Sequence, residues 1–369
     1  MRSLPPWGLA ALSLLATLGR GGLHTAHNEN LAAVARGSLD QLSRIRLENL
    51  FYLLCDPSAP QQALSDRIWQ TQVAELRGLL VQMREFGAHP ILFKGADFSL
   101  RHYGDRSLGM ADIDLLVRRT ELGTARAALF TSGFRQGIPK ATGGWEDFDP
   151  VDLAKIELAH FELVPFTRMT PLALDPGLEA LLDAPGAERL PVLKVHGVPH
   201  VLTTIDLHHG VMLGLDIDPL FDRIRPGPLP GSFSLSATDH FWLCACRSYV
   251  EALREGMRSL RHYAYLIPHA RTENTDWSLL LSECHRTELA PAFFYYLRTL
   301  EILCGRTLAP DAVVQELRAA AAIGCKDNLG WPLAQQLGCV FDPPLDVDAV
   351  LEASLHSTQR ATEEDPAFL

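Results

Sequence analysis

The chain lacks the short motifs that identify several large enzyme classes. No GxxxxGKS/T sequence is present, which excludes a P-loop nucleotide-binding enzyme. The nucleophile motif GxSxG of the α/β-hydrolases is missing, and so are the HRD and DFG motifs of protein kinases. Any catalytic chemistry must therefore come from a different arrangement of residues.

The cysteines lack the spacing of a zinc site or of a redox pair. Cys244 and Cys246 lie in an apolar run, where a buried structural thiol is the usual interpretation. The seven cysteines are Cys55, Cys244, Cys246, Cys284, Cys304, Cys325 and Cys339. An odd number without paired spacing favours a reducing compartment, so we expect a cytoplasmic protein.

Long hydrophobic runs are also missing. The apolar stretch from Trp7 to Leu18 has about a dozen residues, whereas a membrane-spanning helix needs about 20. Its length fits the hydrophobic part of a secretory signal, but no small-x-small cleavage site follows before Arg20. The alternatives are a signal peptide and a short helix that packs on the domain behind it, and we expect no membrane span.

Basic residues are fewer than acidic residues. Lys and Arg number 33 against 44 Asp and Glu, which gives a formal net charge of −11. A protein that binds a phosphate backbone over a large surface needs a basic face, so nucleic acid is a disfavoured partner. The 369 residues, 47% of them hydrophobic, are enough for two domains with a buried core.

Hydrophobic periodicity predicts an α/β core between helical regions. A helix is expected from about Ser65 to Gly87, with one apolar stripe. Strands are expected near 90–93, 112–117, 156–164, 192–195 and 198–208, with a hairpin turn at His196-Gly197. The Pro- and Gly-rich run 226–231 is the best boundary. We predict an N-terminal helical region 1–88, a mixed α/β core 89–231, a C-terminal helical region 232–345 and a polar tail 346–369.

The strongest chemical signal is the sequence Asp112-Ile113-Asp114, followed by Leu-Leu-Val. Alternate side chains on a strand face the same way, so both carboxylates project to one side while Ile113 enters the core. Like charges on one face are unfavourable unless a cation joins them, and Mg²⁺ prefers such oxygen ligands. The alternative is that one carboxylate only caps the strand or faces solvent. The same pattern recurs at 216–218, but Pro219 follows and favours a helix-capping turn there.

Two further elements accompany the carboxylates. Lys94-Gly95 ends the preceding strand, where a glycine lets backbone amides approach a phosphate and a lysine supplies a cation. The alternative is a glycine that only ends the strand, beside a solvated lysine. Asp206 and His208 share a face of a later strand, so Asp206 is a candidate third carboxylate of a two-metal site. A zinc site and a structural histidine are the alternatives for His208. Glu162, on the strand expected at 156–164, is either a hydrogen-bonding neighbour of the site or a residue at the core edge.

These residues resemble a known family. Leu92-Phe-Lys94-Gly95-Ala, Asp112-Ile-Asp114-Leu-Leu-Val and Ile205-Asp206-Leu-His208 are similar to the uncharacterised nucleotidyltransferase family of the DNA polymerase β-like superfamily, over about residues 45–310. The resemblance implies a nucleotidyltransferase-like mixed sheet. It also implies Asp112, Asp114 and Asp206 as ligands of two Mg²⁺ ions, and Lys94-Gly95 in place of the Gly-Ser phosphate loop.

The sequence departs from the family pattern at two positions. Family members often carry Arg four residues before the first Asp, where this chain has Leu108, so Arg106 is the candidate replacement as a nucleotide contact. His209 stands where a Trp is usual, which changes the pocket wall. Neither change removes a carboxylate.

The sequence thus predicts a metal-dependent nucleotidyltransferase. It would move a nucleoside monophosphate from a nucleoside triphosphate, with ATP the expected donor, to the hydroxyl of a small molecule or a protein. One alternative is a catalytically inactive protein of the same fold that binds a nucleotide or a partner. The other is a zinc hydrolase built from Asp206, His208, His209 and His160.

Overall fold

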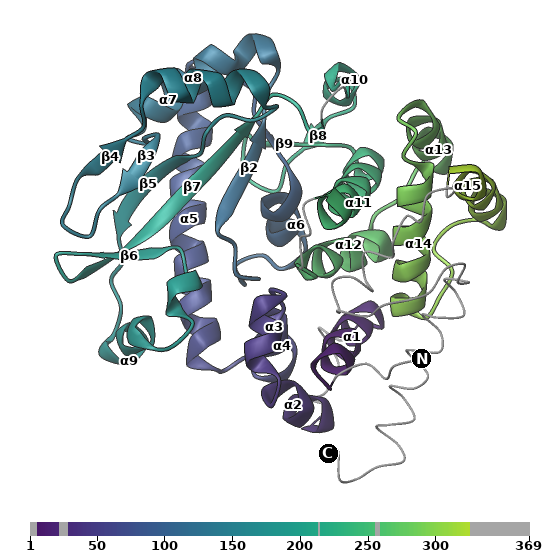
Figure 1. The fold of residues 1–369 in the computed structure, drawn as a ribbon, viewed down its shortest axis with the longest axis horizontal. Helices are drawn as coiled ribbons and strands as arrows, with labels where there is room; N and C mark the ends of the chain where they lie inside the picture. Colours follow the sequence, from purple (N-terminus) through teal and green to yellow (C-terminus); the bar gives the residue numbers. More distant parts are fainter. Residues whose placement is uncertain (1–5, 22–28, 213–214, 255–258, 325–369) are drawn as a thin grey trace. The chain divides into compact units, whose positions relative to one another are not determined.

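The computed structural model describes residues 6–21, 29–212, 215–254 and 259–324. The chain forms two compact units (Figure 1). Residues 58–236 form an α/β unit, and the stretches 1–57 and 237–369 together form a helical unit. The predicted tail 346–369 lies outside the described residues.

A mixed sheet forms the centre of the α/β unit. Its strands run in the order β5-β7-β2-β1-β9-β8, and β6 pairs with β7. β2 is parallel to β7, and β1 is antiparallel to β2 but parallel to β9. The strands are β1 (Ile91–Leu92), β2 (Asp112–Leu116), β5 (Phe166–Pro171), β6 (Val192–Val195), β7 (Val198–His208), β8 (Arg225–Pro226) and β9 (Phe233–Ser234). This arrangement, with its flanking helices, confirms the predicted mixed α/β fold class.

The alternation of residues along β2 and β7 determines which side chains share a face of the sheet. Ile113 and Ile205 are fully buried on neighbouring strands, so the residues on either side of them project to the opposite face. β6 and β7 form the predicted hairpin, whose turn residues His196 and Gly197 have φ angles of 50° and 83°. Two consecutive positive φ angles are typical of the tight turns that join twisted antiparallel strands.

Helix α5 (Pro60–Glu85) is the longest helix of the α/β unit and lies along the sheet beside β7 (Figure 1). Its buried stripe includes Trp69, Leu76 and Met83, as the periodicity predicts. The remaining helices of the unit are α6 (Lys94–His102), α7 (Leu122–Thr131), α8 (Pro150–Ala159), α9 (Pro176–Ala180) and α10 (Asp218–Phe221), with short 3-10 turns η2 (Arg119–Glu121), η3 (Leu181–Asp183) and η4 (Ala187–Arg189). A two-stranded ribbon of β3 (Gly137–Pro139) and β4 (Trp145–Asp147) precedes α8.

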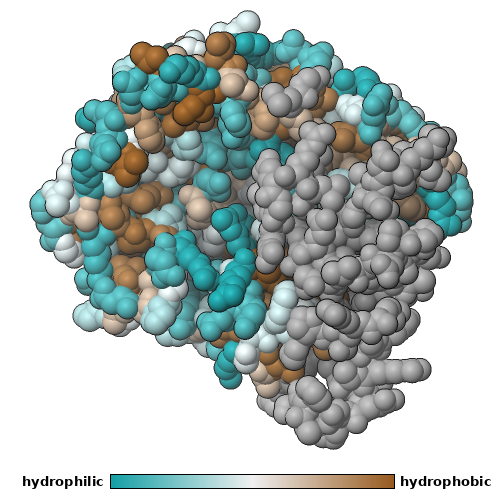
Figure 2. Space-filling view, in the orientation of Figure 1, coloured by the Kyte–Doolittle hydropathy of each residue, from teal (hydrophilic) through white to brown (hydrophobic). Residues whose placement is uncertain are grey.

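The strand predicted at 156–164 is wrong, because residues 156–159 belong to helix α8 and residues 160–164 form only an isolated bridge at Glu162. Asp149 caps the helix by accepting hydrogen bonds from the amides of Val151 and Asp152, and Pro150 occupies the first turn. Two of the apolar side chains that suggested a strand, Ile156 and Leu158, point outward instead, and so does Val151 earlier on the helix. Val151, Ile156 and Leu158 are 62%, 51% and 84% exposed, and Figure 2 shows brown apolar patches over this part of the surface.

The helical unit is built around α14 (Ala290–Cys304), most of whose residues are buried. Helix α1 (Pro6–Gly19) packs against α14 and α12 and buries Leu12, Leu14 and Leu15. The other helices are α2 (Glu29–Arg36), α3 (Leu39–Arg44), α4 (Glu48–Cys55), α11 (Ala237–Arg254), α12 (Arg261–Thr272), α13 (Trp277–Arg286) and α15 (Asp311–Gly324). In the described part of the chain, no helix is both long and apolar enough to cross a bilayer.

Candidate active site

Strand β2 presents its two carboxylates from one face. Asp112 begins the strand and Asp114 follows two residues later, while Ile113 between them is fully buried in the core. Asp114 is itself 7% exposed. The alternation that the sequence predicts is therefore present, and Asp114 is the more buried of the two carboxylates.

The parallel pairing of β2 with β7 brings in the third carboxylate. Asp114 is directly opposite Asp206 in the register, and Asp112 is opposite Thr204. Asp114, Asp206 and His208 each offer one ligand atom, and these atoms lie within 4.8 Å of one another. Residues 92 positions apart in the sequence are thus joined by a ladder of backbone hydrogen bonds, which fixes their spacing.

Lys94 reaches into this group from the start of the helix that follows β1. It is the first residue of α6, and its Nζ lies 2.7 Å from Oδ1 of Asp114. Its φ angle is 49°, in the left-handed region that non-glycine residues seldom occupy. Such a conformation costs free energy, so surrounding contacts must hold it, and the ion pair with Asp114 is one of them.

The environment of Asp114 keeps this carboxylate ionised. Its burial opposes the charged form, but Lys94 and His208 outweigh that effect and hold the pKa of Asp114 well below its usual range. Lys94 acts as a nearby positive charge, and His208 acts mainly through a hydrogen bond to the carboxylate. Asp114 is therefore a permanent negative charge at neutral pH.

The surroundings of Asp206 raise its pKa, whereas those of Asp114 lower the pKa of that residue. Burial, together with the negative charges of Asp112, Asp114 and Glu162, raises the pKa of Asp206 to about 8. Its Oδ1 is buried and, among the described residues, has no hydrogen-bond partner. A buried carboxylate oxygen without a donor, beside other carboxylates, is the arrangement that a divalent cation would complete. The residues present therefore fit a metal site.

His208 and Glu162 lie next to the three aspartates. Nε2 of His208 lies 2.9 Å from Oδ1 of Asp114, and its Nδ1 lies 3.2 Å from Oε2 of Glu162. Glu162 forms an isolated β-bridge with His208, so of its two interpretations the structure favours a neighbour of the site. His209 and His160, the two other histidines of the zinc hypothesis, are not members of the metal-ligating group.

The candidate nucleotide contacts have different surroundings. Gly95 is the second residue of α6, so its amide is among those at the start of a helix that have no intrahelical acceptor. Nε of Arg106 lies 2.8 Å from Asp66 of α5, so an ion pair already holds that guanidinium. Leu108, at the position where the family often has Arg, is 3% exposed and points into the core.

The second copy of the Asp-Ile-Asp pattern lies at the start of helix α10. Oδ1 of Asp216 accepts a hydrogen bond from the amide of Asp218, which begins helix α10. Asp218 also lies 3.6 Å from Arg118. The pattern therefore caps a helix here, as Pro219 predicts.

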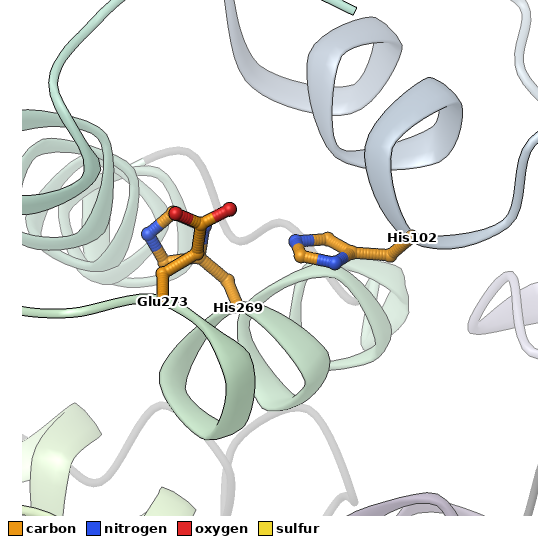
Figure 3. Close-up of side chains that lie close together, drawn as sticks. All are labelled: His102, His269 and Glu273. Atoms are coloured by element: carbon orange, nitrogen blue, oxygen red, sulfur yellow. The ribbon is translucent and has the colours of Figure 1, made fainter.

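Figure 3 draws three other residues with metal-ligating side chains. His269 and Glu273 belong to the C-terminal end of α12 in the helical unit, whereas His102 belongs to α6 in the α/β unit. Because these residues come from different units, we do not assign them to the candidate site.

Comparison with known protein families identifies the family to which the chain belongs. The family model described as "Uncharacterised nucleotidyltransferase" matches residues 57–305, about two thirds of the 369 residues. The chain belongs to this family, which confirms the predicted resemblance. Searches of curated proteins and of solved structures give no match. The matched range contains Asp112, Asp114 and Asp206.

Proposed function

We propose that the protein transfers a nucleoside monophosphate group from a nucleoside triphosphate to a hydroxyl group of an acceptor. The observation that carries the proposal is the in-register pair Asp114 and Asp206 on parallel strands, with a buried oxygen of Asp206 that has no donor among the described residues. Membership of a nucleotidyltransferase family supports the reaction class. We propose Asp112, Asp114 and Asp206 as the ligands of divalent cations, with Mg²⁺ the expected ion.

Each candidate site residue has a distinct role in the proposed reaction. Lys94 and the amide of Gly95, at the start of α6, would hold the β- and γ-phosphates, because a helix N-terminus and a lysine both attract anions. Bound Mg²⁺ supplies positive charge that neutralises the triphosphate and the carboxylates. Arg106 is the candidate contact to the nucleotide, in exchange for its ion pair with Asp66.

The proposed reaction is a displacement at the α-phosphorus. The acceptor oxygen forms a bond to that phosphorus as the bond to the bridging oxygen of pyrophosphate breaks. The hydroxyl proton must leave the acceptor, and Asp206 is either the group that accepts it or a cation ligand on the acceptor side. A small molecule or a protein is the proposed acceptor, because the net charge of −11 disfavours nucleic acid.

A thermal-shift titration tests the site without knowledge of the acceptor. Each nucleoside triphosphate is added with and without Mg²⁺ to the wild type, to Asp112→Asn and to the matched control Asp216→Asn. A ligand at about 100 times its Kd stabilises the folded state by about 2.7 kcal/mol, which moves the unfolding midpoint by a few degrees. We expect a Mg²⁺-dependent shift in the wild type and the control but not in Asp112→Asn. The absence of a shift with every nucleotide at millimolar concentration contradicts the proposal.

The second candidate function is nucleotide binding without transfer. The observation in its favour is the buried Leu108 at the position where the family often has Arg. Release of pyrophosphate in the presence of a panel of hydroxyl-bearing acceptors separates the two. Mg²⁺-dependent binding without any pyrophosphate release favours the inactive binder.

A further inference from the structure

His208 is one of the most enclosed side chains in the α/β unit. It ends β7 and is 0% exposed, although its imidazole carries two polar nitrogens. The ring of Phe161 stacks against it with an interplanar angle of 16°, and the ring of Phe93 meets it edge-on at 79°. Two aromatic rings from different segments therefore fix the plane of the imidazole.

The two nitrogens of this imidazole face two carboxylates. Nε2 lies 2.9 Å from Oδ1 of Asp114, and Nδ1 lies 3.2 Å from Oε2 of Glu162. An ionised carboxylate only accepts hydrogen bonds, so Nε2 donates to Asp114. The imidazole is thus hydrogen-bonded to a carboxylate of the site, and a second carboxylate lies beside its other nitrogen.

The backbone determines the position of Glu162. Residues 161–163 run along the end of β7, where the amide of Leu163 donates to the carbonyl of Leu207 and the amide of His209 donates to the carbonyl of Phe161. These bonds place Glu162 opposite His208 in an antiparallel bridge. Phe161 and Glu162 therefore contact His208 as part of a defined register.

Lys94 and His208 hold the same oxygen of Asp114. Both contacts are made to Oδ1, at 2.7 Å and 2.9 Å, so these two donors leave Oδ2 of that carboxylate available. A carboxylate held through one oxygen presents the other in a fixed direction. Hydrogen bonds of this kind, one step removed from a metal, orient the ligand and raise its affinity for the ion.

We propose that His208, backed by Glu162, is a positioning residue that holds Oδ1 of Asp114 and so directs Oδ2 toward a divalent cation. This inference rests on the proposed function, because it assumes that the carboxylates bind a cation. It assigns His208 no direct bond to the metal, in contrast to a zinc site in which the imidazole itself is a ligand.

The test measures binding of Mn²⁺ alone to the full-length protein, from the electron paramagnetic resonance signal of the free ion. His208→Phe keeps a ring between Phe93 and Phe161 but removes the donor, and we expect Kd to rise about ten- to a hundredfold. His208→Gln, which retains an amide donor, is expected to recover part of the affinity. Glu162→Gln keeps the shape of the partner without its charge and is expected to weaken binding by a smaller factor.

His200→Phe is the matched control. His200 lies earlier on the same strand, where its ring contacts the carbonyl of Val198, and we expect the Kd of its variant to equal that of the wild type. Unfolding midpoints are measured on all variants, because a merely structural role of His208 lowers the midpoint while the folded protein keeps its affinity for Mn²⁺. If His208→Phe does not fold, His208→Gln and Glu162→Gln carry the test.

Three results would overturn the inference. Equal affinity in the wild type and in the folded variants of His208 and Glu162 contradicts it but leaves the proposed function intact. Electron spin-echo modulation from an imidazole nitrogen bound directly to Mn²⁺ in the wild type, lost in His208→Phe, makes His208 a ligand instead. Failure of the wild type to bind Mn²⁺ at millimolar concentration removes both the inference and the proposed metal site.

Discussion

At the scale of single residues, Lys94 combines a charge that the site uses with a backbone conformation that its side chain disfavours. Its φ angle of 49° is a conformation that glycine adopts freely and other residues do not. We therefore expect Lys94→Gly to be more stable than Lys94→Ala by about 1 kcal/mol, the reverse of the usual order in a helix. Urea denaturation of the two variants measures the difference. Greater stability of Lys94→Ala contradicts the left-handed conformation.

Asp206 gives the second prediction at this scale. Its pKa of about 8 in the folded protein lies above the ordinary value, so the folded state retains a proton that the unfolded state releases near pH 4. This contribution to stability is complete below pH 4 and is lost as the pH rises through about 8. In the presence of a chelator, we expect the unfolding midpoint of the wild type to fall more between pH 6 and pH 9 than that of Asp206→Asn. Parallel pH profiles of the two proteins are the contradicting outcome.

Much of the site could be read from the sequence, because strand alternation alone places Asp112 and Asp114 on one face. The part played by Glu162 could not, since its position depends on a bridge to His208 between segments far apart in the chain. The spacing of residues within one segment predicts local geometry only. Tertiary packing determines which residue lies beside the buried imidazole of His208. The roles of Asp112, Asp114, Asp206, Lys94, Gly95 and Arg106 stay predictions until the variants are measured.

At the scale of secondary-structure elements, the end of α1 lies close to α14. A Cβ atom at Gly19 would collide with the backbone carbonyl of Leu303, and backbone cannot move aside as a flexible side chain can. We expect Gly19→Ala to destabilise the protein by about 1–3 kcal/mol, the usual cost of overpacking. Chemical denaturation followed by circular dichroism measures the change.

Gly78 on α5 is the control, because nothing lies within 4 Å of a Cβ added there. Gly78→Ala is expected to stabilise the protein by about 0.5–1 kcal/mol, the helix-propensity difference. Equal effects of the two substitutions contradict the close packing of α1.

The elements differ in how well periodicity predicts them. β7 and α5 follow the patterns expected for them, because each has one buried face. Periodicity fails for residues 156–164, since the exposed Ile156 and Leu158 have the alternating spacing of buried strand positions. The capping by Asp149 and Pro150 was the local signal for the helix that forms instead.

At the scale of the whole molecule, the two units are expected to respond to pH in opposite directions. Burial lowers the pKa of His262, in the helical unit, to about 3, and its Nε2 lies 2.8 Å from the hydroxyl of Tyr296. A histidine with a lowered pKa stabilises the fold above its unfolded value of about 6.5 and loses that contribution as the pH falls toward 3. We expect stability to decline less between pH 7 and pH 4 in His262→Gln than in the wild type, as measured by thermal unfolding. A steeper decline in the variant contradicts the assignment.

The domain boundaries at 88/89 and 231/232 stay predictions. In the structure the division of the chain falls at 57/58 and 236/237 instead, with α5 in the α/β unit. Sequence reading grouped α5 with the helices before it, because a helical pattern does not reveal which partner a helix packs against. Only tertiary packing, through residues such as Trp69 and Met83 of the core cluster, assigns the helix to the sheet.

The discontinuous helical unit has a consequence for biosynthesis. A ribosome makes α1 before the α/β unit, whereas α12 and α14, against which α1 packs, follow only after the whole α/β unit has been made. Synthesis proceeds at about 5–20 residues per second, so many seconds pass between the synthesis of α1 and that of α12 and α14. The contiguous α/β unit can fold in that interval, so α1 reaches its packed position only after the unit that separates it from α12 and α14 has been made.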